Sequence, residues 1–423
     1  MSRRALEGYR VLSLTNHWAG PSAVRLLADM GAQAIKLEAT KRPDPARGPK
    51  AGHRDRREYP NDDVGRDPWN RVPRFNERHL GSLGVALDLS DPRGKQVFLD
   101  LVRVSDVVVE NFSANVMRSL GLDYEVLRQV KSDLIMLSMP GFGASGPWKN
   151  YRSFGPTLEY LSGMAALTGY EAGQSMPSGV LIPDCMAAMH GASAVLVALF
   201  QRQQTGAGQH IELAQLEGTL CLMGDVLLQT AMSGESPMAN GNRHAVFAPH
   251  GCFPCKGGVG KEDAWVTIAV TSEDQWAALC RVAKKDDWLA DPHYTTMAAR
   301  KSHELELNAG IGVWTAGFEK YQLAHLLQKA GVPAAPVLNA RDHFGDPQVL
   351  ARNMLVPVDH PSVGVRSYLG TTWKTSAGPD AEPKPAPTLG QHNRFVLQDI
   401  LGMDAAAVDV LEREGVIGTE PLK

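Results

Sequence analysis

Short apolar runs and amphipathic stretches alternate along the first part of the chain. An apolar run at residues 9–13 predicts a strand, helical spacing over residues 19–30 predicts a helix that stops at Gly31, and residues 34–38 alternate like a second strand. A strand, a helix and a strand in succession form a βαβ unit, and such a unit predicts a parallel sheet.

The alternation continues along the chain. After a long polar loop at residues 41–74, the pattern predicts a helix over residues 93–104, a strand over 106–110, and a strand over 134–138 that ends in a glycine-rich turn. Repeated alternation predicts an α/β fold with an open, doubly wound, Rossmann-like parallel sheet. The fingerprint G-x-G-x-x-G does not follow the first strand, so this shape does not imply NAD binding.

The pattern changes after Gly234, where a predicted strand and a predicted helix are followed by polar helices interrupted by helix-breaking residues. We therefore expect a large domain that begins with residues 1–225, a smaller inserted α+β domain over residues 226–329, and a C-terminal part over residues 330–423. Residues 331–337 are expected to be a proline-stiffened return linker, and residues 378–387 a surface linker by composition.

Composition and charge narrow the function classes. The chain has 423 residues, 43% of them hydrophobic, and a formal net charge of −3. It has neither the basic footprint of a nucleic-acid-binding protein nor a polybasic patch for a membrane surface. The N-terminal apolar run is too short for a signal peptide, and the apolar segment 185–200 falls short of a membrane span. Five cysteines in a chain of this size suggest a reducing compartment, so we expect a cytoplasmic protein. From the charge and the short apolar segments we expect no nucleic-acid or membrane partner.

A metal or redox centre is not expected. Cys252 and Cys255 form a lone C-x-x-C pair that lacks a second pair of ligands at a convincing spacing. We interpret them as two small apolar residues around a turn.

The most informative stretch runs from residue 181 to residue 218. Pro183 and Asp184 stand at the start of a long helix of small residues, and a glycine-punctuated turn and a strand follow. Asp184 is a good N-cap, because its oxygens can accept hydrogen bonds from the first free N–H groups. The same oxygens could attack an electrophile. His190, six residues later, is expected to be hydrogen-bonded and partly buried, with no acid or base role.

This stretch resembles the catalytic region of the class III CoA-transferases, the family of the formyl-CoA:oxalate and carnitine CoA-transferases. Asp184 stands at the place of the family's nucleophile, and Ala188-Met189-His190 at the place of its Gly-Met-His. Further motifs match in the family's order from about residue 8 to the C-terminus: LSLT (12–15), AGP (19–21), LADMGA (27–32), IKLE (35–38), LDL (87–89), SDVVVENF (105–112), GFGASGP (141–147), GNRH (241–244), GVPAAPV (331–337), HP (360–361) and LGQH (389–392).

The resemblance implies a CoA-transferase that moves CoA from an acyl-CoA to a free carboxylic acid through an aspartyl anhydride and an aspartyl-CoA thioester on Asp184. A CoA thioester is then the substrate, and no cofactor is bound permanently. It also implies that the N- and C-terminal parts form one large domain, and that two subunits interlock as a dimer. The dimer is expected to be a homodimer, and a heteromer with a related subunit stays open.

The resemblance further implies a set of CoA-binding residues. They follow the first strand, hold the pantetheine and adenine parts, or face the phosphates: His17, Trp18, Ala19, Lys36, Asn111, Phe112, Arg118 and Arg152.

The chain departs from the family at three places, one of which is Ser119, beside Arg118, in place of the usual Arg before Leu-Gly. Gly81-Ser82-Leu83-Gly84 replaces the usual Asn-Lys-Arg-Ser, so phosphate binding would need other cations, such as Arg78 or the cluster at residues 54–57. Gly155 replaces a residue that is often acidic, so a contact of the oxalate-acting relatives is missing. We therefore expect an acid larger than oxalate, either aromatic or a substituted dicarboxylate. By analogy, its pocket would be lined by the loops around Trp18, Trp148-Lys149 and residues 247–250.

The nearest alternative is an α-methylacyl-CoA racemase, which resembles this chain in fold. Those enzymes exchange an α-proton between two bases, the same Asp and the His of a His-Asp dipeptide about thirty residues upstream. Phe154-Gly155 stands at that place here, and neither residue can hold a proton. The sequence therefore favours CoA transfer, with this chain as the whole enzyme or as the active subunit of a heteromeric one.

Overall fold

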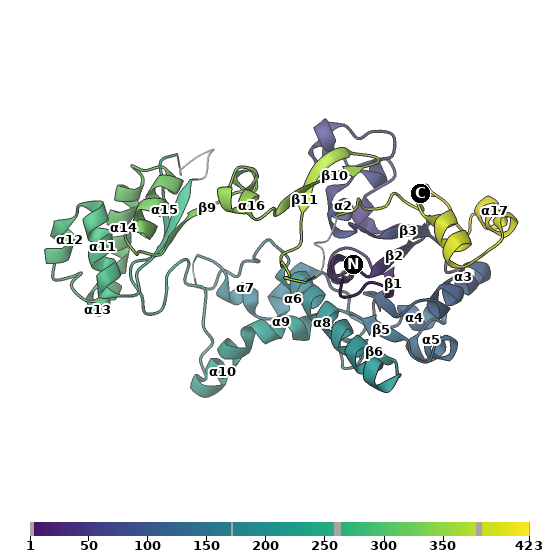
Figure 1. Ribbon diagram of the computed structural model, residues 1–423. Coiled ribbons are helices and arrows are strands. Elements are labelled where there is room, and N and C mark those ends of the chain that lie inside the picture. The colour runs from purple at the N-terminus through teal and green to yellow at the C-terminus, as the bar shows by residue number, and fades with distance from the viewer. Residues whose placement is uncertain (1–3, 171, 258–263, 378–382, 423) are drawn as a thin grey trace. The chain divides into compact units, whose positions relative to one another are not determined.

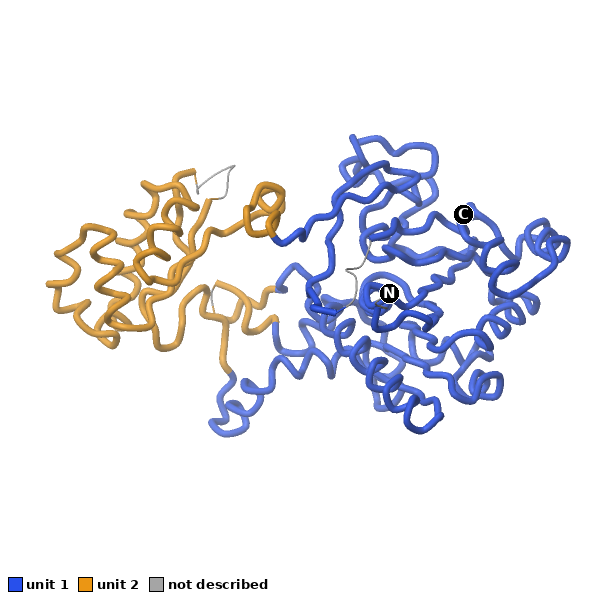
Figure 2. Tube along the Cα trace, viewed as in Figure 1, with its two compact units in different colours: residues 1–164, 177–236, 352–423 blue, residues 165–176, 237–351 orange. Residues whose placement is uncertain are grey.

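The computed structural model describes residues 4–170, 172–257, 264–377 and 383–422. The chain divides into two compact units, which Figure 2 colours separately. Unit 1 comprises Met1–Met164, Pro177–Ser236 and Arg352–Lys423, and unit 2 comprises Ala165–Met176 and Pro237–Ala351.

Unit 1 contains a six-stranded parallel sheet in the order β3-β2-β1-β4-β5-β6 (Figure 1). The strands are β1 Arg10–Leu14, β2 Gln33–Glu38, β3 Leu83–Ala86, β4 Val107–Glu110, β5 Ile135–Ser138 and β6 Gln209–Glu212. The predicted α/β fold with a parallel, Rossmann-like sheet is therefore confirmed. The strand order reverses between β1 and β4, and ligands of open α/β sheets bind at such a switch point.

Helices and one short hairpin surround this sheet. The helices of unit 1 are α1 Ala19–Asp29, α2 Pro73–Arg78, α3 Pro92–Arg103, α4 Val116–Leu120, α5 Tyr124–Val130, α6 Gly155–Leu161, α8 Ile182–Thr205, α9 Gln215–Leu220, α10 Gly224–Ser233 and α17 Ala405–Arg413, and α7 Met164–Leu167 spans the unit boundary. The hairpin is β10 Leu355–His360 with β11 Gly364–Leu369, and Phe395–Ile400 forms a π-helix (η7).

Successive strand residues point to opposite faces of the sheet, so each face has its own hydrophobic core. Leu12, Ile35 and Val108 pack in one core, which includes residues of α3, η7 and α17. Val11, Ala34 and Val107 pack in the other, which includes residues of α1 and α8. Helices on both faces make this a doubly wound sheet.

The predicted polar loop at residues 41–74 contains short helical turns. They are the 3₁₀ turns η1 Pro45–Arg47, η2 Arg56–Glu58, η3 Pro60–Asp62 and η4 Pro68–Asn70, and the chain contains two more, η5 Cys221–Met223 and η6 Asp342–Phe344.

Unit 2 has a three-stranded antiparallel sheet in the order β7-β8-β9. Its elements are β7 His250–Pro254, β8 Trp265–Ala269, β9 Ala334–Val337, α11 Glu273–Ala283, α12 Asp286–Ala290, α13 Met297–Ser302, α14 Glu304–Thr315, α15 Lys320–Lys329 and α16 Pro347–Ala351. The core of this unit joins residues of the sheet, such as Val266 and Ile268, to Leu279, Ile311 and Leu323 of the helices.

Three sequence-based expectations about connecting segments are wrong. Part of the predicted return linker 331–337 forms β9, an edge strand of the three-stranded sheet. Pro336 is tolerated there because one side of an edge strand has no neighbouring strand to which a backbone N–H must donate. Cys252 lies within β7 and not at a turn. Of the predicted surface linker 378–387, residues 378–382 lie outside the described residues, but Ala386 is buried. The domain boundaries at 225/226 and 329/330 stay a prediction.

α8 is longer than the predicted apolar segment. Its 24 residues, with a mean hydropathy of 1.5, make it long and apolar enough to cross a membrane by length and composition alone. However, half of that window is buried inside the protein, and α8 packs in the same core as α1. These properties fit the core helix of a globular unit equally well, so the helix is weak evidence for a membrane span.

A cluster of buried charges lies around the ends of β1 and β2. Lys36 and Asp44 are fully buried, and the Lys36 ammonium lies 3.1 Å from the Asp44 carboxylate. His79 Nε2 lies 3.4 Å from the same carboxylate. Burial disfavours the charged form of Asp44, but Lys36 and His79 outweigh it and hold its pKa well below the usual 3.8.

We predict that Asp44→Asn costs about 3 to 5 kcal/mol of the free energy of unfolding at pH 7, because it leaves a buried ammonium without its counter-charge. A carboxyl group with a depressed pKa stabilises the fold above its unfolded pKa and loses that effect as the pH falls. The difference in the free energy of unfolding between the wild type and Asp44→Asn should therefore shrink below about pH 4.

Urea unfolding followed by circular dichroism measures this difference. Asp55→Asn is the matched control, because Asp55 and its partner Arg57 are exposed, and it should leave the unfolding midpoint unchanged. Equal effects of the two substitutions would show that the buried pair does not hold this region together.

Candidate active site

Asp184 is the third residue of α8, and this position corrects the predicted N-cap. The helix begins at Ile182, and its N-cap is Leu181, in a left-handed conformation with φ 50°. Pro183 fits the first turn, because the first N–H groups of a helix have no intrahelical acceptor. The turn places the Asp184 carboxylate at the helix start, where the helix dipole favours a negative charge.

The Asp184 side chain is largely buried, and one oxygen is unpaired. The residue is 8% exposed, and its Oδ2 atom has no hydrogen-bond partner among the described residues. Burial raises the pKa of Asp184, while the Ala19 backbone, Arg78 and His17 oppose that rise. A carboxylate with an unsatisfied, desolvated oxygen is a stronger nucleophile than a hydrated one.

Gly155 makes room for this oxygen. A Cβ atom built on Gly155 would lie 2.1 Å from Asp184 Oδ2 and 3.3 Å from the Leu181 Cβ atom. No side chain fits there while the carboxylate keeps its position. Gly155 stands where relatives often have an acidic side chain, and the backbone of α6 packs directly against the candidate nucleophile.

The loop after β1 lies beside Asp184 and is fixed from several sides. Asn111 clamps Asn16, since its Oδ1 accepts from the Asn16 N–H and its amide donates to the Asn16 carbonyl, both at 2.8 Å. The His17 N–H donates to Asp44 Oδ1 at 3.1 Å, and this holds His17 at φ 65°. His17 is exposed, and Ala19, two residues later at the start of α1, is buried.

Arg78, the last residue of α2, completes the surroundings of the loop. Its Nη1 donates to the His17 carbonyl at 2.9 Å, and its guanidinium carbon lies 4.2 Å from the centre of the Trp18 ring. The Phe154 ring meets the His17 ring edge-on at 5.6 Å. The structure therefore brings His17, Trp18 and Ala19 together with Asp184.

Lys36 is a predicted CoA-binding residue that the structure places in the buried charge cluster with Asp44. Its side chain is fully buried, and its ammonium donates to the Thr15 carbonyl, Asn16 Oδ1 and Asp44 Oδ2. Lys36 therefore braces the loop after β1, and its contact with CoA stays a prediction. The reason is that β2 is buried from Ala34 to Glu38, so the Lys36 side chain lies inside the protein.

The remaining predicted residues are spread more widely. Both polar ends of the Asn111 side chain are used in the clamp on Asn16, and Phe112 packs partly buried against the hydrophobic core. Arg118 and Arg152 are exposed, and Arg118 lies 3.7 Å from Asp123. CoA binding by Arg118 and Arg152 stays a prediction.

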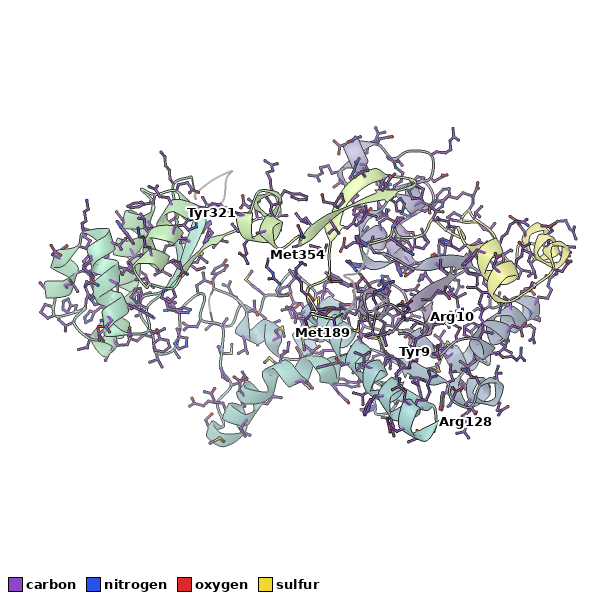
Figure 3. All side chains as sticks on the ribbon, in the orientation of Figure 1. Tyr9, Arg10, Arg128, Met189, Tyr321 and Met354 are labelled. Atoms are coloured by element: carbon purple, nitrogen blue, oxygen red, sulfur yellow. The ribbon has the colours of Figure 1, made fainter. Side chains whose placement is uncertain are left out.

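His190 lies one and two-thirds turns along α8 from Asp184. It is partly buried, as expected, and its Nδ1 atom lies close to Gly218 of α9. The expected hydrogen bond is absent among the contacts of the described residues. Met189, labelled in Figure 3, precedes it on α8 and is exposed.

Comparisons with known proteins define the class. The model of CoA-transferase family III matches residues 6–393, so the chain belongs to this family. The predicted relationship is confirmed, and the chain is a CoA-transferase.

Curated relatives cover almost the whole chain. It is 31% identical to the succinyl-CoA–D-citramalate CoA-transferase of Chloroflexus aurantiacus, over 98% of each chain. It is 30% identical to the succinate–glutarate CoA-transferase of Agrobacterium fabrum, over 95% of this chain and 97% of the relative. A formyl-CoA:oxalate CoA-transferase of Rhodopseudomonas palustris is 29% identical over 97% of each chain.

Solved structures agree in fold. A CAIB/BAIF family protein from Brucella suis matches 95% of this chain and all of its own, with a TM-score of 0.82 and 26% identity. The Mycobacterium tuberculosis protein Rv3272 matches 93% of this chain and 99% of its own, with a TM-score of 0.73 at 22% identity.

We predict that Gly155→Ala lowers kcat by about 100-fold, because the new methyl group must displace the Asp184 carboxylate. Steady-state CoA exchange measures the effect, and circular dichroism verifies that the variant is folded. Gly224→Ala on α10 is the matched control, since a Cβ atom there meets nothing within 4 Å. Full activity of Gly155→Ala would show that the position of the carboxylate is unimportant.

Proposed function

We propose that this CoA-transferase moves CoA from an acyl-CoA donor to a free carboxylic acid through covalent intermediates on Asp184. The observation that carries the proposal is the buried Asp184 carboxylate with one unpaired oxygen, packed against a glycine. A carboxylate held only as a structural cap would use its oxygens on backbone N–H groups. This one keeps an oxygen unused.

The first half of the cycle loads CoA onto the enzyme. An Asp184 oxygen attacks the thioester carbonyl, the C–S bond breaks, and CoA leaves as a thiolate, which gives a mixed anhydride. The thiolate then attacks the aspartyl carbonyl. This step forms an aspartyl-CoA thioester and releases the donor acid.

The second half runs the same steps in reverse with the acceptor. The acceptor carboxylate attacks the aspartyl thioester and expels the thiolate, and the thiolate attacks the acceptor carbonyl of the new anhydride. The products are the new acyl-CoA and the free Asp184 carboxylate. One thioester is made for each one broken, so the exchange is close to thermoneutral and needs no ATP.

Each attack places negative charge on a carbonyl oxygen, and backbone N–H groups can stabilise it. The start of α1 supports this role, because the Ala19 backbone lies close enough to Asp184 to lower its pKa. The first N–H groups of an α-helix also lack intrahelical acceptors.

We propose dicarboxylic acids larger than oxalate as substrates. Gly155 removes the acidic side chain expected in oxalate-acting relatives, and the names of two relatives above refer to succinate, glutarate or citramalate. We further propose a cytoplasmic enzyme that acts as an interlocked homodimer, or with a related subunit, without nucleic-acid or membrane partners. Cys185, Cys221, Cys255 and Cys280 are free thiols in the structure, which is consistent with a reducing compartment.

We predict that Asp184→Asn abolishes CoA exchange, because an amide cannot form the anhydride. Incubation of the wild type with succinyl-CoA and hydroxylamine should leave a hydroxamate on the peptide that contains Asp184, and the variant should show none by mass spectrometry. Asp225→Asn is the control, since Asp225 is an exposed first-turn carboxylate of α10.

Two results would contradict the proposal. One is full exchange activity of Asp184→Asn. The other is incorporation of deuterium at the α-carbon of a 2-methylacyl-CoA without CoA exchange, which would instead support the racemase alternative.

A further inference from the structure

Arg78 is a half-buried cation that the proposed cycle does not use. Its guanidinium is held over the Trp18 ring and donates one hydrogen bond, from Nη1 to the His17 carbonyl. In the part of the chain that the structure describes, it forms no ion pair with a carboxylate. Its Nε and Nη2 groups have no hydrogen-bond acceptor among the described residues.

Two carboxylates act on this guanidinium electrostatically. Burial lowers the pKa of Arg78, and the charge of Asp184, followed by that of Asp44, opposes this shift. Asp44 is already committed, because Lys36, His79 and the His17 N–H surround it. Asp184 is therefore the carboxylate that offsets the Arg78 charge without forming an ion pair among the described residues.

Catalysis would remove the negative charge of Asp184 that offsets the positive charge of Arg78. When Asp184 becomes an anhydride or a thioester it is neutral, so a half-buried guanidinium would lose the negative charge beside it. A partly desolvated charge without a partner is unfavourable. An acyl group that carries its own carboxylate would restore the balance at the step that needs it.

The geometry of Arg78 suits a carboxylate. Guanidinium groups bind carboxylates through two parallel N–H bonds, and stacking on an aromatic face fixes the plane of the group. Trp18 and the His17 carbonyl provide such a fixed plane beside the nucleophile. Asp184 and Arg78 thus stand as the two ends of a site for a bifunctional acid.

We propose that Arg78 binds the second carboxylate of a dicarboxylic acyl group and so determines the substrate class. This inference rests on the proposed function, since it assumes that Asp184 is acylated. CoA phosphates are the competing ligand for this cation, and the test below separates the two.

The test compares succinyl-CoA with butyryl-CoA, which has the same chain length but no second carboxylate. We expect the wild type to prefer succinyl-CoA in kcat/KM, and Arg78→Gln to reduce this preference by about 10- to 100-fold. The loss with butyryl-CoA should be smaller by that factor, because the hydrogen bond to the His17 carbonyl and the charge opposite Asp184 serve both donors. Arg78→Lys should retain part of the preference, because it keeps the charge but loses the paired geometry.

Arg74→Gln is the matched control, because Arg74 lies one turn earlier on α2, is exposed and pairs with Glu58. It should leave the preference unchanged. Thermal unfolding of each variant verifies that the substitution has not destabilised the fold through the loop around His17.

Three outcomes would overturn the inference. Equal losses of kcat with both donors would mean that Arg78 only supports the loop after β1 or the charged form of Asp184. Equal increases in KM for both thioesters, with kcat retained, would assign Arg78 to the CoA phosphates. A preference for succinyl-CoA that survives in Arg78→Gln would place the second carboxylate elsewhere. Hydroxylamine trapping at Asp184 with butyryl-CoA in the wild type and in Arg74→Gln tests the proposed function separately, since both proteins keep Arg78 and this donor has no second carboxylate.

Discussion

The Asp44 carboxylate joins the segments that surround the candidate nucleophile. It accepts a hydrogen bond from the His17 N–H and lies within 3.4 Å of both the Lys36 ammonium and His79. The loop after β1, the strand β2 and the end of α2 therefore meet at one buried charge. Because His17 is held there in a left-handed conformation, the following turn directs Trp18 toward Arg78 and starts α1 beside Asp184.

This support allows Asp184 to remain incompletely satisfied. A buried carboxylate oxygen without a hydrogen bond costs free energy, which the unacylated enzyme tolerates only if the surrounding groups cannot relax around it. The α8 backbone, Gly155 and the braced loop supply that rigidity. Acylation then removes the negative charge that burial disfavours, so the same arrangement that strains the free carboxylate favours the covalent intermediate.

The sequence predicted the parts of this arrangement that depend on local periodicity and ordered motifs. The β1-α1-β2 unit follows from alternating apolar runs, and Asp184 follows from its motif. The role of Asp44 could not be predicted, because it lies in a segment rich in Pro, Arg and Asp whose charges look solvated. The burial of Lys36 and the fit of Gly155 against Asp184 depend on contacts between distant segments, which spacing along the chain does not encode.

The fate of the acceptor oxygen tests the central claim most directly. If Asp184 passes through an anhydride with the acceptor acid, one oxygen of that acid stays on the enzyme when the acyl group leaves as its CoA thioester. Turnover with an acceptor labelled with ¹⁸O in its carboxylate should therefore transfer ¹⁸O into the Asp184 side chain, as seen by peptide mass spectrometry. Exchange of CoA at full rate without ¹⁸O in that peptide would contradict the account.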